Sequence, residues 1–167
     1  MSDLRSATVP PIAEADHVRG PATAPALIQY GDLECAYCAR LHLELEQLRE
    51  RHQFRLVFRH FPIRSAHPRA WAAACAVEAA GLQNRFWEMH DALLGDQAHL
   101  EDPHLWRLAE ALALNVARFD RDRRSSEVGD RVMRDFHGGV RAGVVTVPTM
   151  FWDGRALAPE QLRSIFA

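Results

Sequence analysis

The fold is decided by residues 28–38, which have the sequence IQYGDLECAYC. The apolar run at residues 26–30 predicts a buried β-strand. The pair Cys35 and Cys38 follows it, with two residues between the cysteines. Beyond the pair, leucines at helical spacing extend the face of Cys38, namely Leu41, Leu45 and Leu48. The sequence therefore predicts two cysteines at a strand-to-helix junction, in the first turn of the helix.

This position gives the cysteine pair a specific chemistry. Residues three apart in a helix share a face, which brings their α-carbons close enough for a disulfide. The N–H groups of a first helical turn have no helical partner, and the helix dipole is positive there. Such an environment lowers the pKa of a cysteine to about 3.5–7.5 and favours its thiolate. We expect Cys35 to be the nucleophile and Cys38 to resolve a mixed disulfide, as in thiol–disulfide exchange.

Other interpretations of the cysteines are weaker. A structural zinc site needs four ligands, and no second Cys-x-x-Cys pair follows Cys38. Two inert, buried thiols do not fit a pair at the surface end of a sheet. Cys75 lies in an apolar helical stripe with Trp71 and Ala79, which predicts a small buried core residue. No metal ion and no cofactor are expected.

The composition bounds the class of protein. A chain of 167 residues with 48% hydrophobic residues suits one domain, or one domain with an insertion. A net charge of −2 gives no indication of nucleic-acid binding. No apolar run has the length of a membrane span, and residues 1–15 contain no stretch typical of a signal peptide. We therefore expect a cytoplasmic protein that binds neither nucleic acid nor a membrane.

The rest of the chain divides into three parts. Residues 1–25 are rich in proline and predict an irregular N-terminal arm. Residues 26–62 predict strand, helix and strand, which make a right-handed βαβ unit. Residues 63–143 predict a run of helices, and residues 144–167 predict a strand, a hairpin at Asp153-Gly154, a short strand and a last helix. The expected fold is α/β, a four-stranded mixed sheet interrupted by an all-helical insertion.

Several short motifs together resemble one family. They are residues 17–21 (HVRGP), 30–35 (YGDLEC), 59–62 (RHFP), 72–76 (AAACA), 86–91 (FWEMHD) and 147–149 (VPT). From about residue 17 to its end, the chain resembles the DsbA-like thiol–disulfide oxidoreductases of the thioredoxin fold. It also resembles the thioredoxin-like domain that is fused to some bacterial sodium/proton antiporters. The resemblance implies a βαβ half and a ββα half separated by the helical insertion.

The resemblance also implies the residues of the site. Catalysis would belong to Cys35 and Cys38, and a cis Pro148 would face them. The backbone of Val147 would pair with an extended substrate peptide, with Ala36 and Tyr37 completing the substrate-binding surface. Glu34 could relay a proton, although an exposed turn carboxylate is the simpler interpretation.

Two departures from the family pattern affect the active-site shell. Ala36 stands where the family usually has proline, and Val147 stands where many relatives have threonine. Tyr37 supplies no positive charge that would stabilise a thiolate. Both departures concern the redox potential and the choice of substrate, and neither removes the chemistry of the cysteine pair.

The leading functional hypothesis is an oxidoreductase that reduces, forms or isomerises disulfides in proteins or small molecules. Its redox partner would be a donor of the thioredoxin or glutathione type. Three alternatives stay open: a glutathione-dependent transferase or isomerase of the kappa-class type, a non-enzymatic peptide-binding module, and a zinc-binding protein. The intact Cys35 and Cys38 pair argues against the kappa-class alternative, because those enzymes generally keep one nucleophile.

Overall fold

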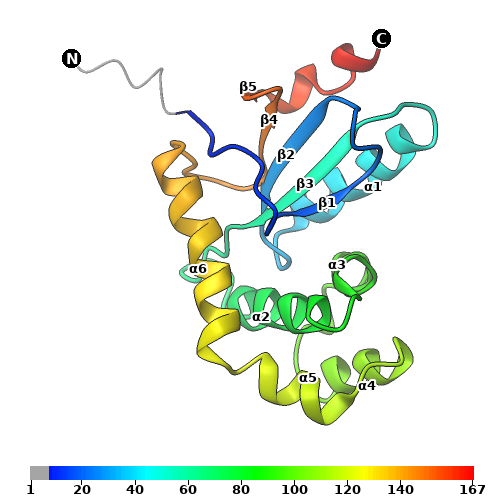
Figure 1. Ribbon diagram of the computed structural model, residues 1–167, viewed down its shortest axis with the longest axis vertical. Coiled ribbons are helices and arrows are strands. Elements are labelled where there is room, and N and C mark those ends of the chain that lie inside the picture. Colours follow the sequence, from blue (N-terminus) through cyan, green and yellow to red (C-terminus); the bar gives the residue numbers. More distant parts are fainter. Residues whose placement is uncertain (1–7) are drawn as a thin grey trace.

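The protein is built on one five-stranded sheet, seen in a computed structural model that describes residues 8–167 (Figure 1). The strand order is β1-β3-β2-β4-β5, in which β2 and β3 run parallel and the other neighbours are antiparallel. This gives the predicted βαβ half, followed after the insertion by a β-hairpin. The strands are β1 (His17–Arg19), β2 (Ala26–Gly31), β3 (Arg55–His60), β4 (Thr149–Trp152) and β5 (Arg155–Leu157).

The sheet has one strand more than the sequence predicts. Strand β1 lies in the arm that was expected to be irregular, and it pairs with β3 through Val18 opposite Val57. A three-residue strand is too short to show a period of two, so its sequence carries no strand signal. Ion pairs also anchor it, because Arg19 binds Glu46 of the first helix and Asp91 of the insertion. The first seven residues of the predicted arm lie outside the described part of the chain.

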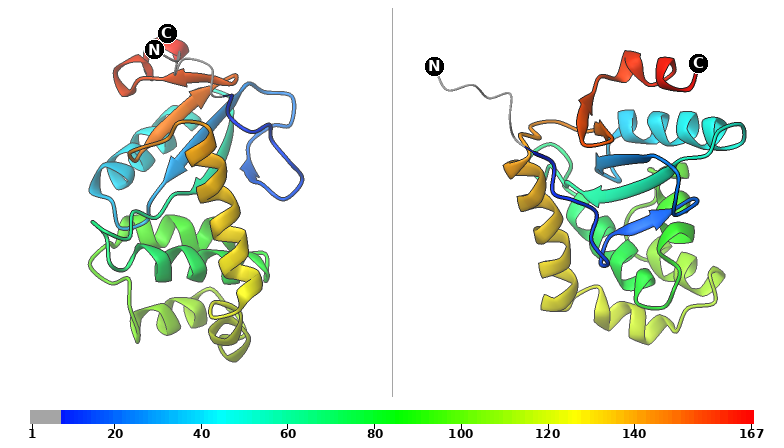
Figure 2. Two further views of the ribbon diagram at one scale, coloured as in Figure 1. Left: turned by 90° about the vertical axis from the view of Figure 1, so that its left-hand side faces the viewer. Right: turned by 45° about the horizontal axis from the view of Figure 1, so that its top comes forward.

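Helix α1 connects the two parallel strands, and five further helices separate β3 from β4 (Figures 1 and 2). In the insertion, α2 contacts α3, α5 and α6, and α6 also reaches back to β3. These helices occupy residues 70–141, within the predicted insertion. Their bounds are α1 (Ala36–Arg49), α2 (Ala70–Gly81), α3 (Phe86–Gly95), α4 (His104–Ala111), α5 (Val116–Asp122) and α6 (Ser126–Arg141).

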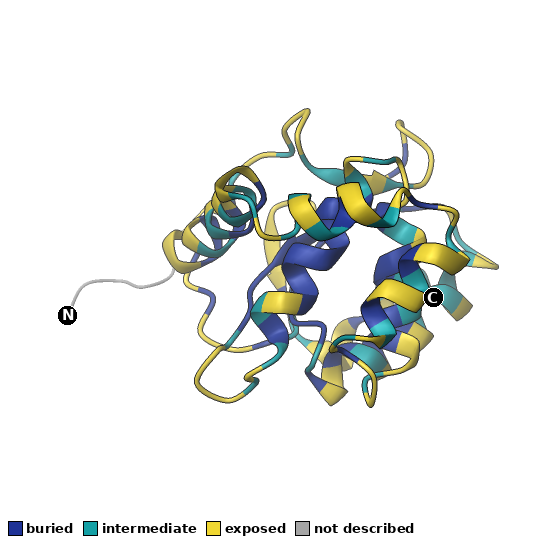
Figure 3. Ribbon diagram, turned by 90° about the horizontal axis from the view of Figure 1, so that it is seen from below, coloured by how far each residue is buried: buried dark blue, intermediate teal, exposed yellow. Residues whose placement is uncertain are grey.

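The core has two main clusters around the sheet. In the smaller, Leu27 and Leu56 of the sheet pack with Leu41 and Leu45 of α1. The larger cluster contains both cysteines of the pair and continues into the insertion helices. Seen from below, the buried positions of the helices turn inwards and the exposed positions form the outer surface (Figure 3). The cysteine pair is thus part of the main core.

The end of the chain differs in part from the prediction. Asp153 and Gly154 form the predicted hairpin turn, and both have positive φ angles, 46° and 79°. The helix expected after Pro159 is instead two three-residue 3₁₀ helices, η2 (Pro159–Gln161) and η3 (Ser164–Phe166). A segment this short makes few helical hydrogen bonds, so packing of Leu162 against the sheet cluster decides its shape. Among residues 8–167, no helix has the length and apolar character needed to cross a membrane.

Candidate active site at the cysteine pair

Both cysteines occupy the predicted junction between β2 and α1. Cys35 is the N-cap residue of α1, with extended backbone angles, and its carbonyl oxygen accepts a hydrogen bond from the Ala39 N–H at 3.1 Å. Cys38 lies in the first turn and is fully buried, and Cys35 is only 4% exposed. Both are free thiols. Although the sequence predicts the pair at the surface end of the sheet, Cys35 is almost covered, and only a small part of its surface faces solvent.

The two thiols differ strongly in acidity. A hydrogen bond from the Cys38 thiol lowers the pKa of Cys35 from about 9 to about 6, with the N–H groups of Cys38 and Tyr37 also contributing. The charge of His67 lowers it further, against the opposing effect of burial. The same hydrogen bond to Cys35, together with burial, raises the pKa of Cys38 far above its ordinary value. Cys35 is thus the thiolate at neutral pH, which is the order of roles that the sequence predicts.

The loop before β4 lies at the same end of the sheet as the cysteine turn, because Thr149 at the start of β4 pairs with Tyr30 near the end of β2. The Val147 carbonyl oxygen is 3.8 Å from the Cys35 sulfur, although the two residues are 112 positions apart. The Val147–Pro148 peptide bond is cis. Ala36 and Tyr37 lie on the outer surface of the helix start, where Tyr37 is strongly exposed. The structure therefore brings together all the residues that were predicted to bind substrate.

A buried carboxylate next to the pair was not assigned from the sequence. Asp32 accepts hydrogen bonds from the N–H groups of Glu34 and Ile63 and from the His67 ring, each at 2.8 Å. Its own N–H donates to the Cys38 sulfur at 3.4 Å. Burial opposes protonation of His67, but the hydrogen bond and charge of Asp32 raise the pKa of His67 above 6.5. The charged form of His67 thus favours the Cys35 thiolate, although the residues between the cysteines carry no positive charge.

Glu34 is not the exposed turn carboxylate that was the simpler interpretation, because its side chain is only 12% exposed. Its carboxylate accepts from the Arg69 backbone N–H at 2.6 Å and from the Arg69 Nε at 2.8 Å. Proton relay by Glu34 stays a prediction. Gln97 of the insertion donates to the carbonyl oxygens of Leu33 and Cys35 at 2.8 and 3.0 Å. No sequence pattern predicts that Arg69 and Gln97 support the cysteine turn, because their hydrogen-bond partners are more than thirty residues away in the chain.

Cys75 lies outside the site, as predicted. It is buried in a small cluster with Ala74, Val128 and Val132. Burial raises the pKa of its thiol to about 11, with the charge of Glu78 adding to the effect. A thiol of this kind stays protonated at neutral pH and is a poor nucleophile.

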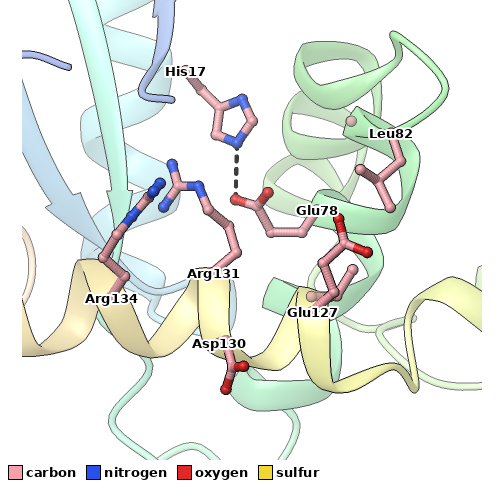
Figure 4. Close-up of a pocket in the computed structure, with 9 residues that line it drawn as sticks. His17, Glu78, Leu82, Glu127, Asp130, Arg131 and Arg134 are labelled. Carbon is pink, nitrogen blue, oxygen red and sulfur yellow. Dashed lines mark hydrogen bonds and ion pairs between the residues drawn. The ribbon is translucent and has the colours of Figure 1, made fainter. Parts of the chain in front are cut away.

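Two other clusters in the described residues have the donor atoms for a metal ion: His42, His90 and Asp91, and His60, Glu78 and Asp135. In each, a carboxylate is already paired with an arginine, Asp91 with Arg19 and Asp135 with Arg131. Glu78 accepts hydrogen bonds at 2.9 Å from the rings of His60 and His17, and Figure 4 shows the His17 contact at the edge of a cavity. These contacts give the clusters a structural role. In the first cluster, His90 is fully buried and its ring is hydrogen-bonded to Asp91 at 2.8 Å.

The fold and the cysteine site define a thioredoxin-fold protein. The sequence profile of the Thioredoxin family matches residues 13–166, and the chain belongs to that family. A thioredoxin-like oxidoreductase from Silicibacter pomeroyi superposes with a TM-score of 0.80 at 22% identity, covering 92% of this chain and 91% of that one. BdbD from Bacillus subtilis superposes with a TM-score of 0.76 at 15% identity, covering 89% of each chain. The predicted fold is confirmed.

The curated relatives are much longer proteins. The Na(+)/H(+) antiporter NhaA 1 of Mycolicibacterium gilvum is 42% identical over 147 residues, which is 85% of this chain and 24% of the antiporter. The NhaA antiporter of Herminiimonas arsenicoxydans is 41% identical over 160 residues, 93% of this chain and 25% of the antiporter. The chain thus spans about a quarter of the length of these relatives, which agrees with the resemblance to an antiporter-fused domain.

Proposed function

We propose that this protein is a thiol–disulfide oxidoreductase in which Cys35 attacks a disulfide and Cys38 resolves the product. The observation that carries the proposal is the unequal acidity of the two thiols. Cys35 has a pKa of about 6, and its hydrogen-bonded neighbour Cys38 keeps its proton. A nucleophile that is ionised near neutral pH and a protonated resolving thiol beside it are what stepwise exchange requires.

The reaction has two balanced steps. The Cys35 thiolate attacks one sulfur of the substrate disulfide, and the other sulfur leaves as a thiolate that takes up a proton from water. Cys38 then loses its proton and attacks the Cys35 sulfur of the mixed disulfide, which releases the second substrate thiol. The protein dithiol has been oxidised to a disulfide, and the substrate disulfide has been reduced to two thiols. A thiol donor of the glutathione or thioredoxin type returns the protein to the dithiol.

We place this reaction in the cytoplasm and in the direction of reduction or isomerisation. The proposal uses two of the three cysteines for catalysis and leaves Cys75 as a free thiol. A protein with few cysteines and no structural disulfide is typical of a reducing compartment. The low pKa of Cys35 acts in the other direction, because a stabilised thiolate makes a disulfide more oxidising. The reduction potential of the Cys35–Cys38 couple against glutathione therefore decides which direction is physiological.

Insulin reduction with dithiothreitol tests the proposal. The wild type should accelerate precipitation of the insulin chains, Cys35→Ser should be inactive, and Cys38→Ser should accumulate mixed disulfides through Cys35. The matched control is Cys75→Ala, which removes a buried thiol outside the site and should leave the turnover nearly unchanged. A wild type without activity in this assay, or a Cys35→Ser variant with full activity, would refute the proposal. A Cys38→Ser variant with full glutathione-transferase activity would favour the kappa-class alternative.

A further inference from the structure

An apolar groove of about 500 Å³ opens on the surface between the loop after β3 and helix α6. Its lining is mostly aliphatic and aromatic, and Phe61 stacks on Phe136 with a centroid separation of 4.5 Å. The one charged side chain in the lining, Arg64, lies 5.1 Å from the Trp71 ring centroid. We call this the α6 groove, and its principal apolar residues are Phe61, Ile63, Trp71, Met133, Phe136 and Val145.

The α6 groove is continuous with the cysteine site along two routes. Ile63, in its lining, donates its N–H to Asp32, and the Asp32 N–H donates to the Cys38 sulfur. On the other side, Val145 stands two residues before Val147, whose carbonyl oxygen lies 3.8 Å from the Cys35 sulfur. A peptide whose cysteine sulfur is held at Cys35 can therefore place a side chain in the α6 groove from a position a few residues away.

The backbone beside the groove is free to bind a peptide. Within residues 8–167, the N–H groups of Val145, Thr146 and Val147 donate to no protein acceptor. Val145 is 87% exposed, although it is a large apolar residue at the mouth of the groove. An extended peptide that paired with this segment would present successive side chains to opposite faces. Some of its side chains would then point into the groove.

We propose that the α6 groove binds an aliphatic or aromatic side chain one or two positions from the disulfide cysteine of a polypeptide substrate. This inference rests on the proposed function and adds a substrate class to it. The occupant is a polypeptide because its backbone carbonyl groups can accept hydrogen bonds from the free N–H groups at residues 145–147. The side chain that it inserts is apolar because the groove lining is mostly aliphatic and aromatic and contains no acidic residue. The volume of the groove is within the usual range for binding pockets.

A peptide series tests this with the reduced, full-length protein. Each peptide carries one cysteine as a mixed disulfide with thionitrobenzoate, in a serine-rich background, and a single leucine is moved from position −2 to position +2. Attack by Cys35 releases the coloured thionitrobenzoate, and Cys38 then releases the peptide thiol. At one or more positions, leucine should raise the second-order rate constant for release of thionitrobenzoate about tenfold over serine, the lower end of the discrimination that hydrophobic pockets reach.

Val145→Glu should abolish this preference and give a preference for lysine at the same peptide position. Because Val145 is highly exposed, its replacement should not affect folding. The matched control is Val140→Glu, a change at an apolar residue of α6 that is 53% exposed and lies outside the groove lining. The control should keep the preference for leucine.

Each result has a distinct meaning. If the protein releases thionitrobenzoate from all peptides at equal rates, the groove has no role in substrate choice and the inference is wrong, while the proposed function stands. The same conclusion follows if Val140→Glu and Val145→Glu behave alike. If no peptide is attacked and insulin is not reduced, the proposed function itself fails. The Cys35→Ser variant tests one further outcome. If the leucine peptide binds this variant only when two copies of the protein dimerise, the α6 groove is an interface between copies of this chain and not a substrate site.

Discussion

The acidity of Cys35 comes from its neighbours in space and not from the two residues that separate it from Cys38. Ala36 and Tyr37 carry no charge, yet the pKa of Cys35 is about 6. The Cys38 thiol provides the largest contribution, and the charged form of His67, 32 residues further along the chain, adds a smaller one. Because Asp32 raises the pKa of His67, this buried carboxylate favours the charged ring and so indirectly favours the Cys35 thiolate. The absence of a cation at Tyr37, noted from the sequence, is thus compensated elsewhere.

Replacing His67 with glutamine should make Cys35 less acidic. Glutamine can still donate a hydrogen bond to Asp32, but it removes the positive charge that favours the thiolate. The pKa of Cys35 should rise from about 6 towards its ordinary value of 9, and the disulfide should become less oxidising. The rate of alkylation by iodoacetamide, followed between pH 5 and pH 9, measures the shift. His99→Gln is the control, since His99 pairs with Asp96 on an exposed surface, and an equal effect of both changes would contradict the role of His67.

Glu78 should make the fold sensitive to acid. Burial disfavours its charge, but the hydrogen bonds from His17 and His60 lower its pKa well below the ordinary value of 4.5. A carboxyl group with a lowered pKa stabilises the folded state at pH values above its unfolded pKa, and this stabilisation is lost as the pH falls. Glu78→Gln should therefore lower the free energy of unfolding by about 1.5–3 kcal/mol at pH 7, the contribution of hydrogen bonds to a charged group.

Urea titrations at pH 7 and at pH 3 measure this difference. The gap between the wild type and Glu78→Gln should narrow at pH 3, because the wild type loses part of its own stabilisation there. Glu127→Gln is the control, since Glu127 lines the same cavity in Figure 4 but lies at an exposed position. A gap that is constant with pH would show that the shape of Glu78, and not its charge, stabilises the fold.

At the scale of elements, helix α6 can approach the sheet because of one glycine. A Cβ atom at Gly139 would lie 2.7 Å from the Phe61 ring and 2.9 Å from the Tyr30 ring. Both rings belong to the core, so neither can move away freely. At Gly129 of the same helix, a Cβ atom would meet only the Trp71 ring, at 3.5 Å or more. The close approach of α6 also brings Met133 and Phe136 to the α6 groove.

Alanine substitutions at these two glycines should have opposite effects. Gly139→Ala should lower the free energy of unfolding by about 1–3 kcal/mol, the usual cost of overpacking a core. Gly129→Ala should raise it by about 0.5–1 kcal/mol, because alanine favours the helix and finds room. Urea unfolding of both variants at pH 7 measures the two changes. A Gly139→Ala variant with unchanged stability would mean that α6 can shift outwards. Such a shift would change the α6 groove, and the variant's preference for leucine in the peptide assay should then change.

The elements show which parts of the fold a sequence can predict. Strands β2 and β3 and the run of helices within residues 63–143 could be predicted because apolar residues recur in these segments at strand or helix spacing. Strand β1 was missed because three residues show no period, and the last helix was wrong because tertiary packing decides that segment. Arg59, which alternates with apolar residues in β3, is not at the surface. It is buried and binds Asp16 through two hydrogen bonds, since the N-terminal arm covers that face.

At the scale of the whole molecule, the site is assembled from parts that no local pattern relates. The cysteines could be predicted because the motif and its strand–helix setting are contiguous in sequence. His67, Arg69 and Gln97 could not, since they reach the cysteine turn only when the insertion folds against the sheet. The insertion therefore does more than add core. Its side chains hold the turn that contains Cys35.

Gln97 is the residue that tests this coupling. Its amide donates to the carbonyl oxygens of Leu33 and Cys35, and the guanidinium of Arg69 donates to the Gln97 carbonyl oxygen at 3.1 Å. Gln97→Ala removes both hydrogen bonds that this side chain donates, so the carbonyl oxygens of Leu33 and Cys35 can then bind only water. We expect the turn to open more often, so that backbone amides at residues 33–38 exchange their hydrogens faster. Alkylation of Cys35 at pH 9, where the thiol is fully ionised, should accelerate several-fold as its cover loosens.

Gln83→Ala is the matched control for this last prediction. The Gln83 amide also bridges two segments, with hydrogen bonds to the backbone N–H and carbonyl oxygen of Asn115, but both of these lie inside the insertion. Its loss should cost a similar amount of stability, about 0.5–1.5 kcal/mol per hydrogen bond, without changing the reactivity of Cys35. If both variants leave alkylation at pH 9 unchanged, the cysteine turn is held by α1 and the sheet alone. If both accelerate it equally, the effect is general loosening of the insertion and not a contact with the site.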